Sequence, residues 1–119
     1  MSNCKEKKPV DTEKDEIYKD IANYLKILSH PIRLQILDIL SIEELCVCDI
    51  ERYFQISQAA VSKHLKLMVE GGILNFRQDG MKNMYSIKDP TVIKLIRDLE
   101  KNIFDVLETR LKKYKKLNR

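Results

Sequence analysis

The 119-residue chain is long enough to form one domain with a hydrophobic core of its own. Its composition, 44% apolar and 34% charged, is typical of a soluble globular protein and excludes a disordered one. No apolar run approaches the roughly 18 residues of a membrane span, and the start lacks the apolar core of a secretory signal. The three cysteines, an odd number, indicate free thiols in a reducing cytoplasm. A net charge of +4 permits nucleic-acid binding without requiring it.

The first part of the chain predicts a mobile arm followed by helices. Residues 1–16 are polar and of mixed charge, so we expect an N-terminal arm ahead of a single domain over 17–119. Apolar residues then recur at helical spacing. Together with N-cap, proline and glycine signals, they predict four helices that begin at Ile17, at Pro31, at Asp49 (ending near Phe54) and after Ser57 (ending at Gly71).

The second half of the chain predicts a β-hairpin and a long last helix. The segments 73–77 and 84–87 are short and apolar, and Asp79-Gly80 between them is typical of a hairpin turn. Asp89-Pro90 then predicts the start of a helix that runs to about Leu117. At 1.5 Å per residue this helix is about 40 Å long. It should therefore overhang a small body.

The last helix carries an apolar seam on one face. The residues of this seam are Val92, Ile96, Leu99, Ile103, Val106, Leu107, Leu111 and Tyr114, of which the first five are the candidate interface residues. An apolar face that overhangs the body needs a partner, so we expect a two-fold homodimer in which these helices pair. The alternative is a helix that folds back on its own domain.

A short helix, a tight turn, a polar-faced helix and a hairpin, in that order, predict a winged helix-turn-helix. The fold class is therefore mostly α, with a two-stranded β wing. The second helix of such a pair enters the major groove of DNA, and its outward residues here are Gln58, Ala59, Ser62, Lys63, His64 and Lys66. Arg77 and Lys82 in the hairpin suit phosphates or the minor groove. Each residue alone fits a solvated polar face, but their combination favours double-stranded DNA as a partner.

Two cysteines flank one valine just before the short third helix. Cys46 and Cys48 share a face only in extended backbone, so they can chelate one ion only if this stretch is extended or frayed. Cys4 on the arm can supply a third sulfur, and three soft sulfurs suit a metalloid or a soft heavy metal. The alternative on residue chemistry alone is that Cys46 is a buried thiol of the core and that Cys4 binds no metal.

Three segments resemble the ArsR/SmtB family of metalloregulatory repressors. Residues 28–37 are similar to the second helix of that family, residues 57–65 to its recognition helix, and residues 44–50 to its thiolate metal box. The resemblance implies a cytoplasmic homodimer that binds a palindromic operator without any cofactor. It further implies that the protein leaves the operator when metal binds Cys46 and Cys48.

The sequence also departs from the patterns of that family. Glu51 stands where arsenical-responsive members often have a third cysteine, and the arm has Cys4 alone where cadmium- and lead-responsive members often have two. The last helix has no histidine, which argues against the site of zinc-responsive members. Because three thiolates fill a trigonal site, we nevertheless expect trivalent arsenic or antimony as the inducer, and cadmium or lead as the second choice. With Glu51 or water as an added ligand, cadmium or zinc is also accommodated.

Other functions remain open at this level. The same thiols in the same fold suit a redox or persulfide sensor. A helical dimer that only scaffolds a partner is a further alternative. An enzyme is not expected, because the sequence has no nucleophile–base motif, glycine-rich phosphate loop or metal-hydrolase motif. Nor do we expect a membrane partner.

Overall fold

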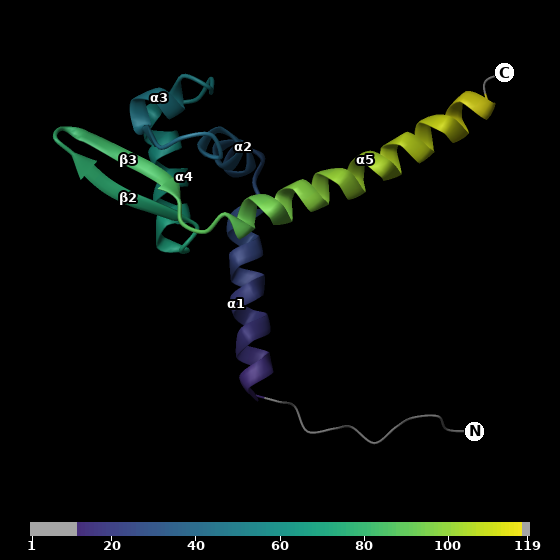
Figure 1. Cartoon of the computed structure of the whole chain (residues 1–119), viewed down its shortest axis with the longest axis horizontal. Coiled ribbons are helices and arrows are strands. Elements are labelled where there is room, and N and C mark those ends of the chain that lie inside the picture. Colours follow the sequence, from purple (N-terminus) through teal and green to yellow (C-terminus); the bar gives the residue numbers. More distant parts are fainter. Residues whose placement is uncertain (1–11, 118–119) are drawn as a thin grey trace.

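The structure is a computed structural model, and it describes residues 12–117 (Figure 1). Its elements are α1 (Thr12–Leu28), α2 (Pro31–Leu40), β1 (Leu45–Cys46), α3 (Val47–Glu51), α4 (Gln58–Glu70), β2 (Leu74–Asp79), β3 (Lys82–Ile87) and α5 (Thr91–Leu117). The chain is mostly helical, and α3, α4 and the β2–β3 hairpin follow one another as a helix-turn-helix and its wing. This order confirms the predicted fold class.

Local signals position the starts and ends of the central helices. His30 precedes α2 in extended backbone, and its Nδ1 accepts a hydrogen bond from the Ile32 amide at 3.1 Å. The Ser57 hydroxyl accepts from the Ala60 amide at 3.1 Å, so this residue caps α4 as predicted. Gly71 closes the same helix by donating to the Leu67 carbonyl at 2.9 Å. Residues near each end therefore determine the length of α4.

Two helices have boundaries that differ from the prediction. Helix α1 begins at Thr12, five residues before Ile17, so residues 12–16 belong to a helix and not to the arm. Residues 1–11, the remainder of the predicted arm, lie outside the described residues. Helix α3 spans Val47–Glu51 and not 49–54, because the chain turns helical directly after a strand. The apolar pattern alone did not predict that the backbone changes from strand to helix between Cys46 and Val47.

A third strand enlarges the wing into a small sheet. The strand order is β1-β3-β2, and both pairs are antiparallel. β1 pairs through Leu45 with Tyr85 and through Cys46 with Met84. Its two residues are too few to show the alternation that predicts a strand. The hairpin closes over Gly80-Met81, and the φ of 62° at Gly80 is one that a side chain would strain.

The core lies between α2, α3, α4 and the sheet. The largest side chains that it buries completely are Ile36, Leu37, Ile50, Val61, Leu65, Met68 and Ile73. Among the described residues it buries no polar or charged residue. Val92, the first residue of α5's predicted seam, is only 2% exposed and packs in this core. We therefore assign Val92 to the core of its own chain, which corrects its place in the predicted interface.

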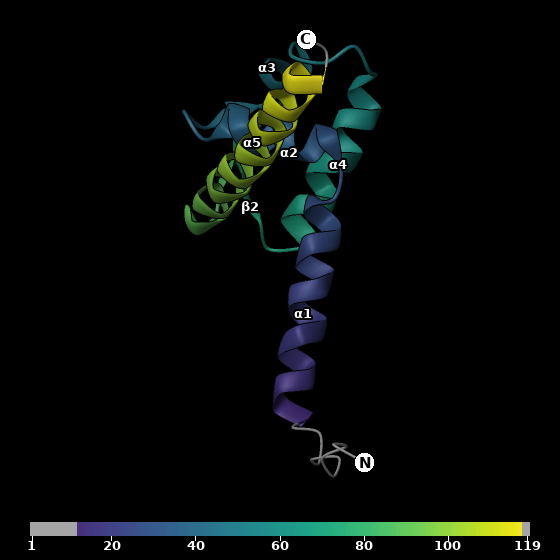
Figure 2. The same cartoon turned by 90° about the vertical axis from the view of Figure 1, so that its right-hand side faces the viewer.

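Helices α1 and α5 project from the body (Figures 1 and 2). The molecule measures 70 × 55 × 23 Å, and its radius of gyration of 20.0 Å exceeds the roughly 13–14 Å of a compact chain of this length. Leu99, Ile103 and Val106 of the seam are each about half exposed, whereas Ile96 packs partly against the core. α5 thus overhangs as predicted and does not fold back. Between residues 12 and 117, no helix is apolar and long enough to cross a membrane.

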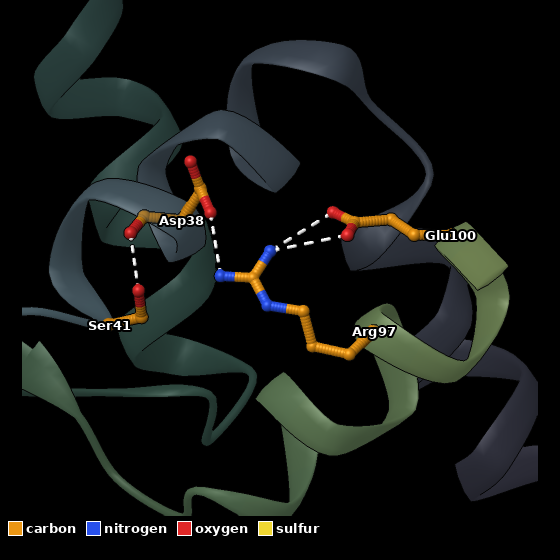
Figure 3. A network of polar contacts seen from close by, with 4 residues as sticks. All are labelled: Asp38, Ser41, Arg97 and Glu100. Atoms are coloured by element: carbon orange, nitrogen blue, oxygen red, sulfur yellow. Dashed lines mark hydrogen bonds and ion pairs between the residues drawn. The ribbon is translucent and has the colours of Figure 1, made fainter. Parts of the chain in front are cut away.

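Arg97 attaches the first part of α5 to α2 (Figure 3). Its guanidinium donates to the Asp38 carboxylate at 2.9 Å and to both oxygens of Glu100 at 3.1 and 3.3 Å. The Ser41 hydroxyl donates to the backbone carbonyl of Asp38 at 2.5 Å, which closes the end of α2. Because the planar guanidinium fixes the direction of its bonds, this network helps to set the angle at which α5 leaves the body.

Candidate nucleic-acid interface and cysteine site

Helix α4 has one buried and one exposed face. Val61, Leu65 and Met68 are fully buried against α2, α3 and the sheet. The exposed side chains are those of Gln58, Ala59, Lys63 and Lys66, and Ser62 is half-buried between them. These are the residue types that reach base edges and phosphates. Apart from His64, the residues predicted to point outward on α4 are therefore exposed or half-buried on this face.

His64 contacts other residues of its own chain. Its Nδ1 accepts a hydrogen bond from Nε of Arg33 at 3.1 Å, and its ring lies 4.5 Å from the ring of His30. Burial lowers the pKa of His64 below its ordinary value, and the nearby His30 and Arg33 lower it further. The imidazole therefore contacts α2 through Nδ1, which favours a packing role for His64 over a direct phosphate contact.

The wing presents Lys82 more freely than Arg77. Lys82 is exposed at the start of β3. By contrast, Nε of Arg77 donates to both carboxylate oxygens of Glu44 at 3.0 Å, and Asp79 lies 3.8 Å from the same guanidinium. The hydrogen bonds hold the pKa of Glu44 below and the pKa of Arg77 above their ordinary values. To make its predicted phosphate contact, Arg77 must therefore break its hydrogen bonds to Glu44.

The cysteine pair spans the junction of β1 and α3. Cys46 ends the strand with φ −79° and ψ 162°, and its side chain is buried. Cys48 lies within α3 and is exposed. The expected extended backbone is therefore present at Cys46 only. The Cys46 thiol donates to the Asp49 carboxylate at 3.2 Å. The sequence pattern did not predict this contact of Asp49, which lies three residues after the N-cap residue Cys46.

The segment from Cys46 to Glu51 provides several metal-binding donors but does not form a complete metal site. Among residues 12–117, no three histidine, cysteine, aspartate or glutamate side chains are grouped so as to hold a metal ion. Glu51 has one buried carboxylate oxygen with no hydrogen-bond partner, and it stands three residues after Cys48 on the same helix. Cys4 lies outside the described residues. Two thiols and two carboxylates in six residues are chemically suited to a thiophilic ion, provided that the junction rearranges.

Comparisons with known proteins identify the family. The profile of the bacterial regulatory protein, arsR family, matches residues 30–75, from His30 before α2 into β2. The arsenical resistance operon repressor of Staphylococcus aureus is 42% identical over 82 residues, which cover 69% of this chain and 79% of the repressor. The chain belongs to the ArsR family. The cadmium resistance transcriptional regulatory protein CadC homolog of Staphylococcus aureus is 40% identical over 78 residues, or 65% of this chain and 64% of that protein.

A solved structure of a possible ArsR-family transcriptional regulator agrees with the fold. The homodimeric winged helix-turn-helix DNA-binding domain of a Mycobacterium bovis regulator matches with a TM-score of 0.75 at 25% identity. The match covers 86% of this chain and 94% of that domain. The ArsR-family match therefore extends beyond the helix-turn-helix to most of the described helices and strands.

Proposed function

We propose that this ArsR-family chain is a transcriptional repressor that binds operator DNA as a homodimer and leaves it when a thiophilic ion binds its cysteines. The observation that carries the proposal is the position of Cys46 and Cys48 at the β1–α3 junction. β1 pairs with β3 of the wing, and α3 packs against α4. Both DNA-binding elements are thus in direct contact with the cysteine box.

The DNA interface consists of one face of α4 and the tip of the wing. Its members are Gln58, Ala59, Ser62, Lys63 and Lys66 from α4, with Lys82 and, after release from Glu44, Arg77 from the wing. Gln58 can pair bidentately with adenine, and the lysines can reach guanine or phosphate. No cofactor is needed for these contacts.

The homodimer forms through the exposed apolar faces of the projecting helices. On α5 the interface consists of Ile96, Leu99, Ile103 and Val106, and α1 adds its exposed apolar side chains, among them Ile17 and Ile21. Two-fold symmetry presents two copies of α4 a helical turn of DNA apart, so the operator is a palindrome.

Ion binding and DNA binding oppose one another in this arrangement. Cys46 is buried and hydrogen-bonded to Asp49, whereas Cys48 is exposed on α3. Both sulfurs can face one ion only after the junction changes conformation. That change moves β1 against β3, and α3 against α4. By thermodynamic linkage, the ion and the DNA weaken each other's binding by the same factor, typically about 5- to 150-fold.

The donor chemistry ranks the inducing ions. Three thiolates from Cys46, Cys48 and Cys4 suit a trigonal site, so trivalent arsenic or antimony is our first choice. Cadmium or lead is second, and zinc follows if Asp49 or Glu51 adds oxygen donors. The relatives named for arsenical and cadmium resistance support the same two groups of ions.

A DNA-binding assay of the reduced protein tests this function. The operator is first selected from random duplex DNA, and arsenite, antimonite, cadmium, lead and zinc are then titrated in parallel. Cys46→Ser and Cys48→Ser should each bind the operator normally but no longer leave it. Cys4→Ser should lose part of the response if Cys4 is a ligand.

Two results would contradict the proposal. One is a double Cys46→Ser, Cys48→Ser variant that still leaves the operator on adding the same ion. The other is release of the parent by peroxide or polysulfide but by none of the ions, which would indicate the redox sensor instead.

A further inference from the structure

Arg33 connects three helices through two hydrogen bonds. It lies in the first turn of α2, and one terminal nitrogen of its guanidinium donates to the Ile27 carbonyl near the end of α1 at 3.1 Å. Its Nε donates to Nδ1 of His64 in the middle of α4 at 3.1 Å. The last carbonyls of a helix lack partners within that helix, so the first bond satisfies such a group. One side chain thereby bridges α1 and α4 through its planar guanidinium.

The bridge requires a neutral imidazole. His64 accepts at Nδ1, so its proton must be on Nε2, whereas a protonated ring would direct an N–H at the guanidinium. The titratable and charged groups that face the ring are Arg33 in α2 and His30 just before it, and both oppose protonation. The α4 residues one turn away are uncharged: Ala60, Val61, Leu67 and Met68. His30 itself caps α2 through its own Nδ1.

We infer that Arg33 and His64 are positioning residues for DNA binding. Their hydrogen bond fixes α4 relative to α1, and α1 carries an exposed apolar face of the proposed dimer. The Arg33–His64 hydrogen bond therefore helps to fix the distance between the two copies of α4 in the dimer. The inference rests on the proposed function, in which α4 reads DNA. It adds that the protein binds its operator well only while His64 is neutral.

The pH dependence of operator binding separates this role from a direct phosphate contact. If protonation of His64 breaks the bridge, affinity should fall as the pH drops from 7.5 to 5.0, by roughly tenfold if the coupling is typical. A histidine that contacts phosphate would show the opposite sign, because its added positive charge strengthens binding to DNA. The sign alone therefore distinguishes the two roles.

Substitutions of the two histidines identify the titrating group. His64→Asn retains an acceptor near the position of Nδ1 and does not titrate, so we expect parental affinity at pH 7.5 and a flat profile down to pH 5.0. His30→Asn is the matched control, because asparagine is a good N-cap; it should keep the pH dependence, shifted slightly to higher pH because His30 no longer opposes the protonation of His64. These are the only two histidines in the sequence. Fluorescence anisotropy with the selected operator, at constant ionic strength, gives the affinities.

Arg33→Lys provides a second test that does not depend on His64. Lysine keeps the charge but lacks the fixed fork that reaches two acceptors, so affinity should fall roughly tenfold at pH 7.5, with the dimer intact in sedimentation. Parental affinity of Arg33→Lys, a parental pH profile of His64→Asn, or a parent that binds equally or more tightly at pH 5.0 would each overturn the inference. Absence of specific DNA binding by the parent at pH 7.5 would overturn the proposed function as well.

Discussion

The Glu44–Arg77 ion pair lets the role of the wing be tested quantitatively. The side chain of Glu44 is 30% exposed and that of Arg77 is 53% exposed, so solvent and DNA can reach the pair. Glu44→Gln keeps the shape of the side chain but removes its charge, which leaves Asp79 at 3.8 Å as the remaining carboxylate beside Arg77. Arg77 should then turn more readily to a DNA phosphate, and the variant should bind the operator more tightly than the parent.

The salt dependence gives the magnitude of this effect. Each phosphate contact adds about −0.9 to the slope of log affinity against log salt concentration. A dimer has two copies of Arg77, so Glu44→Gln can steepen the slope by at most about 1.8. Between 50 and 200 mM salt, a fourfold change, the advantage of the variant should then shrink by up to roughly 12-fold.

The assay is a titration of labelled operator at several salt concentrations. Glu43→Gln is the matched control, because it removes the same charge one residue earlier from an exposed side chain. We expect Glu43→Gln to show only the small gain of a general charge change. If Glu44→Gln matched Glu43→Gln in affinity and in slope, Arg77 would not contact DNA, and its pairing with Glu44 would be purely structural.

Three further predictions concern assembly, specificity and stability. Leu99→Asp should raise the dimer dissociation constant at least roughly 100-fold, because it buries an unpaired charge. The control Lys101→Asp, on the opposite face of α5, should leave the dissociation constant unchanged. An intact Leu99→Asp dimer in sedimentation would place the interface elsewhere. Gln58→Ala should relax the preference for one base pair by about 1–3 kcal/mol, whereas Lys63→Ala should weaken binding to every sequence equally. The assay is competition with operators mutated at single base pairs. If both variants lost the same amount of sequence preference, the prediction would be contradicted. The free energy of unfolding should decrease as the pH drops below 6.5, because the pKa of His64 is lowered in the folded state and the unfolded chain takes up the proton first. Urea denaturation should show that the free energy of unfolding depends less on pH in His64→Asn than in the parent. An unchanged pH dependence would refute the assignment of this effect to His64.

Local chemistry in the sequence predicted most of the secondary structure and the exposed face of α4. Ser57 caps α4, Gly71 ends it, and Pro31 begins α2, each through interactions within a few residues. The apolar periodicity identified the overhanging seam of α5, because helical spacing repeats every three to four residues. The Cys46–Cys48 pair was also visible, since only Val47 separates its two members in the sequence.

Only the tertiary structure decided how these parts are connected. Glu44 meets Arg77 across 33 residues and Arg33 meets His64 across 31, and no periodicity or cap signal links such distant positions. β1 has two residues, too few for a strand pattern, yet its pairing with β3 places the cysteine box beside the wing. The change from strand to helix within the box buries Cys46 and exposes Cys48, because side chains two residues apart share a face only in a strand.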